Sequence, residues 1–178
     1  LVSDSLDLGD YEDSGPCAFG QGMEQGFKII QISDLHVGPT IKKRYVEEVV
    51  ELAMSTEPDL IALTGDMLDG CVEGLAEHLR PLKNLKGKYG KYFVTGNHEY
   101  YWGADAWIDF FENELGYTHL LNEHATIEIN GSKLLVGGVP DLRSARRFKK
   151  HHSSPIESLP SHNDYDLSLL LAHPPRSR

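Results

Sequence analysis

The sequence has few cysteines, no long apolar run and no basic residue near its beginning. Cys17 and Cys71 are far apart, without the dense spacing of a disulfide framework or the C-x-x-C spacing of a metal pair. We therefore expect buried or idle thiols and favour a reducing compartment. No stretch approaches the roughly 18 apolar residues that a membrane helix needs, and the pattern of a secretory signal is missing.

The first segment of the chain is acidic and contains no basic residue. Residues 1–26 contain six of the 27 acidic residues and neither Lys nor Arg, and they are rich in Asp, Ser and Gly. This composition predicts a flexible leader or linker. Because the chain opens on Leu1 rather than Met, we expect it to be part of a longer protein. The net charge of −10 argues against duplex nucleic acid as a partner, since an acidic surface repels phosphate backbones.

The remainder has the composition of one globular domain, which we place at residues 27–178. The whole chain of 178 residues is 40% hydrophobic and 25% charged. Short apolar runs at 27–33, 59–64 and 91–95 predict buried strands. An amphipathic pattern around 45–53 predicts a helix between the first two strands. Strand and helix in alternation predict an α/β fold with a largely parallel sheet.

The later part of the chain continues this organisation. A helical stretch over 72–85, with a break at Pro81, separates the second and third strands, and another helix is expected over 104–115. Strand-like runs follow at 125–129 and 133–139, and the Asn-Gly pair between them is a hairpin signal. A last strand is predicted over 167–172.

Polar side chains follow the predicted strands at the point where each strand ends. In open α/β sheets the crevice beyond the carboxyl ends of the strands binds ligands, so we expect these side chains to converge. A mixture of carboxylate, imidazole and amide suits Mn, Fe or Zn better than the all-oxygen shells of Ca or Mg. The residues, in chain order, are Asp34, His36, Asp66, Asn97, His98 and His173.

These residue types favour phosphoester hydrolysis by a dinuclear metal centre. Asp34 and His36 are close enough to bind one cation, and the two oxygens of Asp66 could bridge two. Two ions about 3.5 to 4 Å apart can hold a phosphoryl group and generate a bridging hydroxide near neutral pH. His98, beside Asn97, is placed to protonate the leaving group or to bind the phosphoryl.

The motifs together resemble those of the calcineurin-like metallophosphoesterases over residues 27–178. Residues 32–40 and 92–101 more narrowly resemble the membrane-anchored branch, transmembrane proteins with a metallophosphoesterase domain and their bacterial phosphodiesterase relatives. The resemblance implies a sandwich of mixed sheets flanked by helices. The matching motifs are Asp34-x-His36, Gly65-Asp66, Gly96-Asn97-His98-Glu99 and His173.

The resemblance also implies a ligand set. Asp34, His36 and Asp66 would hold one metal, Asp66, Asn97 and His173 would hold the other, and His98 would be the catalytic histidine. Phosphodiesters or lipid-linked phosphates are the implied substrates. Membrane attachment would come only from an anchor preceding the domain.

The family's Gly-His-x-His motif does not occur before the chain stops at Arg178. We therefore expect a C-terminally partial domain that by itself binds metal weakly and turns over little. His151, His152 and His162 do not replace the motif, because each precedes the last strand and lacks the glycine.

Several residues have two interpretations. Glu99 could orient a metal ligand or cap the helix that follows it. Arg143 begins a basic stretch that could meet an anionic substrate or be a solvated loop. That stretch contains Arg143, Arg146, Arg147, Lys149 and Lys150.

The aromatic residues after the third motif are also ambiguous. They could form a lipid- or nucleoside-facing wall near the metals, or they could belong to the core. These residues are Tyr100, Tyr101, Trp102 and Trp107.

Two other functions remain open at this stage. A catalytically silent phosphoesterase fold could bind a protein partner, although the intact ligand set up to His173 argues against it. A phosphatase with a single metal is the third hypothesis.

Overall fold

The computed structural model describes residues 26–143, 148–159 and 165–173. The predicted leader, apart from Gly26, lies outside the described residues, as do Cys17, Arg146, Arg147 and His162. Among the described residues, every helix is too short or too polar to span a bilayer.

The first sheet has four parallel strands in the order β1-β2-β3-β4, as the alternating pattern predicts. Its predicted strands are confirmed with slightly shorter bounds, but the expectation that all three are buried is wrong for β1, in which only Ile32 is buried. The strands are β1 (Ile29–Ile32), β2 (Leu60–Leu63), β3 (Lys91–Phe93) and the short β4 (Thr118–His119), which the sequence pattern missed.

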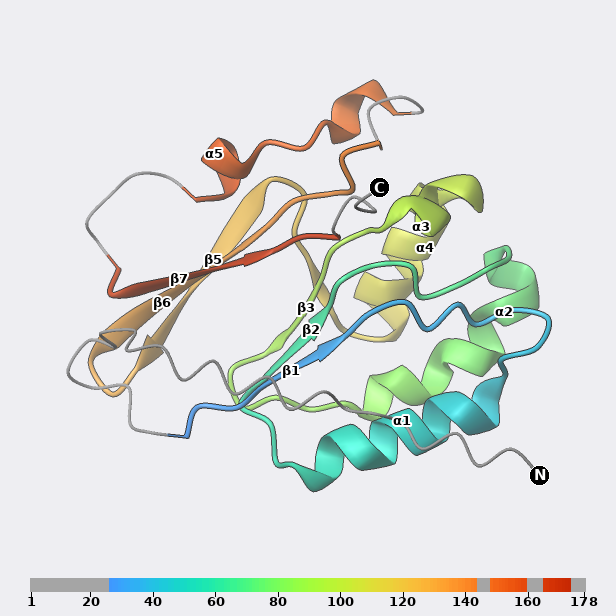
Figure 1. Ribbon diagram of the computed structural model, residues 1–178, viewed down its shortest axis with the longest axis horizontal. Helices are drawn as coiled ribbons and strands as arrows, with labels where there is room; N and C mark the ends of the chain where they lie inside the picture. Colours follow the sequence, from blue (N-terminus) through green and yellow to red (C-terminus); the bar gives the residue numbers. More distant parts are fainter. Residues whose placement is uncertain (1–25, 144–147, 160–164, 174–178) are drawn as a thin grey trace, which may run out of the picture.

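Helices connect these strands and cover one face of the sheet (Figure 1). Helix α1 (Lys43–Ser55) joins β1 to β2, and α2 (Val72–Leu79) follows β2. The predicted break at Pro81 is confirmed, because α2 gives way there to a 3₁₀ helix, η1 (Arg80–Asn84).

The second sheet is mixed. Strands β5 (Glu123–Ile129) and β6 (Ser132–Gly138) form an antiparallel hairpin, and β7 (Leu167–Leu171) pairs with β6 in parallel. The predicted Asn-Gly turn is confirmed, since Asn130 and Gly131 have φ angles of 50° and 88°, as a type I′ turn requires.

Strands β2 and β3 of the first sheet lie between two apolar layers, which explains the continuous hydrophobic sequence of β2. Ile61, Leu63 and Phe93 pack in the core that also holds the buried residues of α1 and α2. The alternate residues Leu60 and Tyr92 pack with the second sheet. The fold is therefore a sandwich of two sheets with helices outside the first one (Figure 1).

Short elements occupy the carboxyl end of the first sheet. Helix α3 (Asn97–Tyr101) begins directly after β3, and α4 (Ala104–Asp109) follows it. The predicted helix over 104–115 continues as a π-helix, η2 (Phe110–Glu114). After β6 come a 3₁₀ helix, η4 (Lys149–His151), and α5 (Pro155–Ser158), in a segment where the sequence pattern predicts no helix or strand.

Candidate active site

The loops after β1 and β2 place the candidate ligands through an unusual backbone conformation. Asp34, His36 and Asp66 have φ angles of 56°, 48° and 56°, in the left-handed region that few non-glycine residues adopt. The backbone N–H of Asp34 donates to the carbonyl of Gly65, and that of His36 donates to the carbonyl of Asp66. The two loops thus hold each other in a strained form, which is common where side chains must be aimed at a functional site.

The loops after β2 and β3 approach each other closely enough to require glycine. A Cβ added at Gly65 would lie 2.3 Å from the backbone nitrogen of Gly96, and Gly65 also has a φ of 91°. A Cβ at Gly96 would lie 2.2 Å from Oδ1 of Asp66. The glycines of the Gly-Asp and Gly-Asn motifs therefore let the two strand ends meet.

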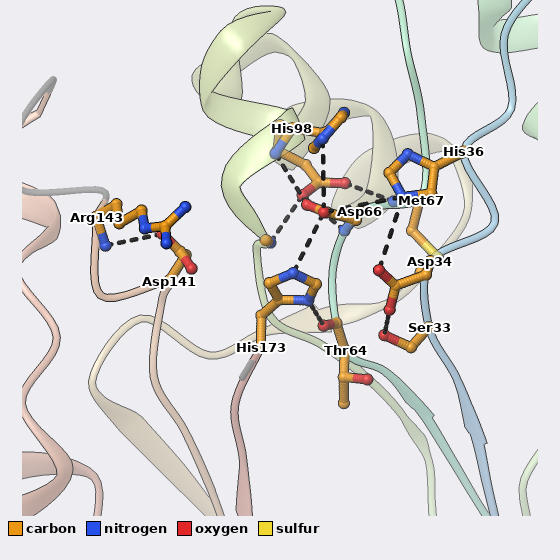
Figure 2. Close-up of polar contacts among 12 residues, drawn as sticks. Ser33, Asp34, His36, Thr64, Asp66, Met67, His98, Asp141, Arg143 and His173 are labelled. Carbon is orange, nitrogen blue, oxygen red and sulfur yellow. Dashed lines mark hydrogen bonds and ion pairs between the residues drawn. The ribbon is translucent and has the colours of Figure 1, made fainter. Parts of the chain in front are cut away.

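Asp66 is the centre of the side-chain cluster, with three imidazoles around it (Figure 2). Its Oδ1 accepts the backbone N–H of His98 at 2.9 Å. Its Oδ2 lies 3.2 Å from Nε2 of His173, 3.8 Å from Nε2 of His98 and 4.0 Å from Nε2 of His36. Asp34 lies at the edge of the cluster, with Oδ1 3.6 Å from Nε2 of His36.

Each imidazole is oriented through its other nitrogen. Nδ1 of His173 donates to the backbone carbonyl of Thr64 at 2.8 Å. Nδ1 of His36 lies 3.1 Å from Oδ2 of Asp69, and Nδ1 of His98 bonds the other oxygen of that carboxylate. All three Nε2 atoms are thereby directed toward Asp66. Metal-ligating histidines have this arrangement, with the second nitrogen bound to a carboxylate or a carbonyl.

Asp69 is the site residue that the sequence interpretation missed. It lies three positions after Asp66, in the loop that follows β2, where its backbone N–H donates to the carbonyl of Val37 at 2.8 Å. The sequence contained a signal for Asp69, because this carboxylate, like that of Asp66, follows the predicted strand over 59–64. Its role depends on the pairing of the loops after β1, β2 and β3, which the spacing of the motifs does not reveal.

Glu99 hydrogen-bonds to both segments that its two interpretations involve, the start of α3 and the loop that bears Asp66. Its buried carboxylate accepts the backbone N–H of Gly96 at 2.7 Å, which caps α3. The same carboxylate accepts the N–H groups of Asp66 at 3.1 Å and Met67 at 2.8 Å, which fixes the loop bearing Asp66. Burial raises the pKa of Glu99, and the backbone hydrogen bonds oppose that shift.

The charges of Asp66 and His173 stabilise each other. Burial acts to raise the pKa of Asp66, but hydrogen bonds from His173 and His98 outweigh it and hold that pKa below its usual range. Burial likewise acts to lower the pKa of His173, yet the contact with Asp66 raises it to about 9. A cation that binds both residues would take the place of this proton.

The donor atoms fit divalent metal ions. One group of donors consists of His36, Asp66 and His98, and a second of Asp34, Asp66 and His173, with one ligand atom from each residue within 4.8 Å of the others. Nitrogen and carboxylate donors in this proportion suit Mn, Fe or Zn. Asp66 belongs to both groups. The groups divide the histidines differently from the resemblance, which assigned His36 to the ion held by Asp34 and gave His98 no metal.

The remaining candidates occupy different positions around the cluster. Asn97 is the first residue of α3, next to His98. Arg143 is exposed and lies to one side of the cluster, where its backbone N–H donates to Asp141 at 2.7 Å (Figure 2). His151 is buried and its Nδ1 lies 2.9 Å from the hydroxyl of Tyr100.

Comparison with known proteins agrees with this fold. The pattern of the family described as calcineurin-like phosphoesterase matches residues 27–177. A putative metallophosphoesterase of Caenorhabditis elegans is 39% identical over 84% of this chain and 31% of its own length. An uncharacterized metallophosphoesterase of Helicobacter pylori is 34% identical over 86% of this chain and 40% of its own length. A transmembrane protein with metallophosphoesterase domain from Bos taurus is 31% identical over 83% of this chain and 35% of its own length.

The fold and the family match define a metallophosphoesterase domain. The chain belongs to the calcineurin-like phosphoesterase family, for which metal-dependent phosphoester hydrolysis is the implied chemistry. It spans about a third of the length of the worm relative and two fifths of that of the Helicobacter relative.

Proposed function

We propose that the protein hydrolyses phosphodiesters at a dinuclear metal centre built around Asp66. The observation that carries this proposal is that three imidazole rings point toward the same carboxylate. His36, His98 and His173 each direct Nε2 toward one buried carboxylate while Nδ1 is bonded to another acceptor. These four side chains come from the segments that follow β1, β2, β3 and β7, and their convergence is what a bridged pair of cations would need.

The site residues have two proposed roles, metal binding and proton transfer. Asp34, His36, Asp66, Asn97 and His173 would hold the ions, with Asp66 shared between them. Two such ions, when bound, position the phosphoryl group and activate water. His98, whose side chain is 21% exposed, supplies a proton to the leaving oxygen from Nε2. Asp69 keeps the ring of His98 in the orientation for that transfer, because it bonds Nδ1.

Mn, Fe and Zn are the proposed ions, and lipid-linked phosphates are a second proposed substrate class. Membrane attachment of the whole protein, through a segment outside the described residues, is supported by the names of relatives from Danio rerio and Bos taurus, each a transmembrane protein with metallophosphoesterase domain. No duplex nucleic acid is proposed as a partner.

Hydrolysis of bis(4-nitrophenyl) phosphate by the full-length protein with Mn tests the activity. We expect Asp66→Asn to lose metal and turnover together, because its carboxylate is common to both groups of donors. His98→Gln should retain most of the metal and lose rate, since its main role is proton transfer. Normal turnover in both variants would show that the site does not carry the reaction.

Metal analysis separates this proposal from its rivals. Two ions per chain are expected for the dinuclear centre, and one ion would indicate the single-metal phosphatase. A protein-binding module without chemistry has no need to retain ions, so a metal-free and inactive protein would favour that alternative. The donors present up to His173 argue against such a loss of function.

A further inference from the structure

The aromatic residues around α3 separate into two groups in the structure. Tyr100 and Trp107 belong to the interior, with 4% and 0% of their surface exposed. Tyr101 and Trp102 are each 46% exposed and are among the few large apolar side chains on the surface of the described residues. Burial therefore accounts for the first two residues, whereas the second two keep nearly half of their surface open to solvent.

Tyr101 stands beside the proposed proton donor. It lies one turn after His98 on α3, and the centroids of the two rings are 5.2 Å apart with an angle of 55° between their planes. The His98 ring cannot turn away, because Nδ1 is bonded to Asp69 and the T-shaped contact with His36 packs against it at 4.5 Å between centroids. Tyr101 therefore lies beside an imidazole whose orientation is held by Asp69 and His36.

We propose that Tyr101 is a specificity-determining residue that stacks on a flat aromatic group carried by the leaving oxygen of the phosphoester. The inference rests on the proposed function, because it uses His98 to define where the leaving group lies. An oxygen that receives a proton from Nε2 of His98 must be close to that ring. A planar substituent on that oxygen then lies within reach of the exposed part of Tyr101.

An aromatic substituent fits this position better than a small alkyl one. Aromatic pairs prefer offset or tilted stacking, and base–aromatic stacking is a common way to bind a nucleoside. A methyl ester has too little surface to contact a ring one helical turn away. A long alkyl chain could cover the same ring by apolar contact alone, and this source of affinity has to be separated by experiment.

The experiment measures binding of phosphonates to the full-length, Mn-loaded protein by calorimetry. Phenylphosphonate, hexylphosphonate and methylphosphonate share the metal-binding group and differ in the substituent. We expect phenylphosphonate to bind about tenfold more tightly than methylphosphonate, as one stacked ring pair permits. Tyr101→Ala should reduce this ratio to near one, and Tyr101→Phe should keep it because the ring remains.

Two further variants complete the test. Tyr165→Ala, which truncates a tyrosine just before β7 and so at the far end of that strand from His173, should bind as the natural protein does. Tyr101→Leu should lose the preference for phenylphosphonate but keep affinity for hexylphosphonate, because it retains apolar surface without a ring.

The outcomes are distinct. A natural protein that binds phenyl- and methylphosphonate equally, or a Tyr101→Ala variant with an unchanged ratio, would overturn the inference. Preference for hexylphosphonate over phenylphosphonate would also overturn it, in favour of a lipid-like leaving group. Phosphonate binding without any hydrolysis of bis(4-nitrophenyl) phosphate would instead overturn the proposed function, while the ratio would still decide the role of Tyr101.

Discussion

Glu99 accepts the backbone N–H of Met67 at 2.8 Å, although 32 positions separate the two residues in the chain. The other oxygen of the same carboxylate accepts the N–H groups of Asp66 and Gly96. One buried side chain thus joins the loops that follow β2 and β3. The position of Asp66 depends on this junction as much as on its own strand, because all three N–H groups would otherwise lie without an acceptor at the base of the site.

Substitution of Glu99 by Gln should destabilise the domain and weaken metal binding. The amide offers one oxygen in place of two, so at least one of the three N–H donors loses its acceptor and faces an NH₂ group. We expect the free energy of unfolding to fall by about 1 to 3 kcal/mol. Urea denaturation measures this change. Glu112→Gln, at an exposed position in η2, is the matched control and should change little. Equal stability of the two variants would contradict the role given to Glu99.

Substitution of Gly96 by Ala should displace Asp66. The φ of Gly96 is −89°, which any residue tolerates, so the effect is steric and arises from the 2.2 Å approach of the new Cβ to Oδ1 of Asp66. Mn affinity, measured by calorimetry, should fall by tenfold or more, on the order of the loss seen when groups that support a metal site are removed.

The control for Gly96→Ala is Gly74→Ala. Gly74 lies in α2, and a Cβ there would meet no atom within 4 Å. Ala in a helix is favoured over Gly by about 0.5 to 1 kcal/mol, so this variant should be slightly more stable and bind Mn normally. Unchanged Mn affinity in Gly96→Ala would mean that the two loops can separate without disturbing Asp66.

Much of the fold could be predicted because its signals are local. The run that became β2 is entirely apolar, since all four of its residues are buried, and Asn130 with Gly131 marks a turn by backbone conformation alone. Strand β4 has only two residues, Thr118 and His119, and no period can be seen in so short a segment. It exists because it pairs with β3, a contact between distant residues.

The site was predictable as far as strand ends could be identified. Asp66 and His173 follow β2 and β7, which belong to different sheets, and the packing of the two sheets brings Nε2 of His173 to 3.2 Å from Oδ2 of Asp66. Asp69 was not identified, because its function comes from hydrogen bonds to histidines in two other loops. Likewise, the sequence could not decide whether Tyr101 is buried, since that depends on which side of a five-residue helix faces the core.

Substitution of Asp69 by Asn should lower the rate of hydrolysis more than it lowers metal affinity. The carboxylate bonds Nδ1 of both His36 and His98, and an amide can accept from only one of them through its single oxygen. We expect kcat with bis(4-nitrophenyl) phosphate to fall by about 10- to 100-fold. Asp109→Asn, at an exposed position in α4, should leave kcat unchanged. If Asp69→Asn loses no more kcat than Asp109→Asn does, Asp69 has no role in the reaction.

His119 should make the stability of the domain sensitive to acid. Its side chain is 8% exposed on β4, its ring centroid lies 5.6 Å from that of Phe93, and its Nε2 has no hydrogen-bond partner among the described residues. Burial, helped by the nearby charge of His151, lowers the pKa of His119 from 6.5 to about 4. Between these two values the unfolded chain binds more protons than the folded one, so acid favours unfolding.

The contribution of His119 is therefore complete above pH 6.5 and is lost as the pH falls toward 4. The difference between a pKa of 6.5 in the unfolded chain and about 4 in the folded one corresponds to at most about 3 kcal/mol of unfolding free energy. Urea denaturation at pH 7.5 and at pH 5 should show a smaller loss in His119→Gln than in the natural protein, because Gln does not titrate. His124→Gln, at an exposed position on β5, should retain the full loss. If His119→Gln loses as much stability between the two pH values as His124→Gln does, the acid sensitivity comes from other groups.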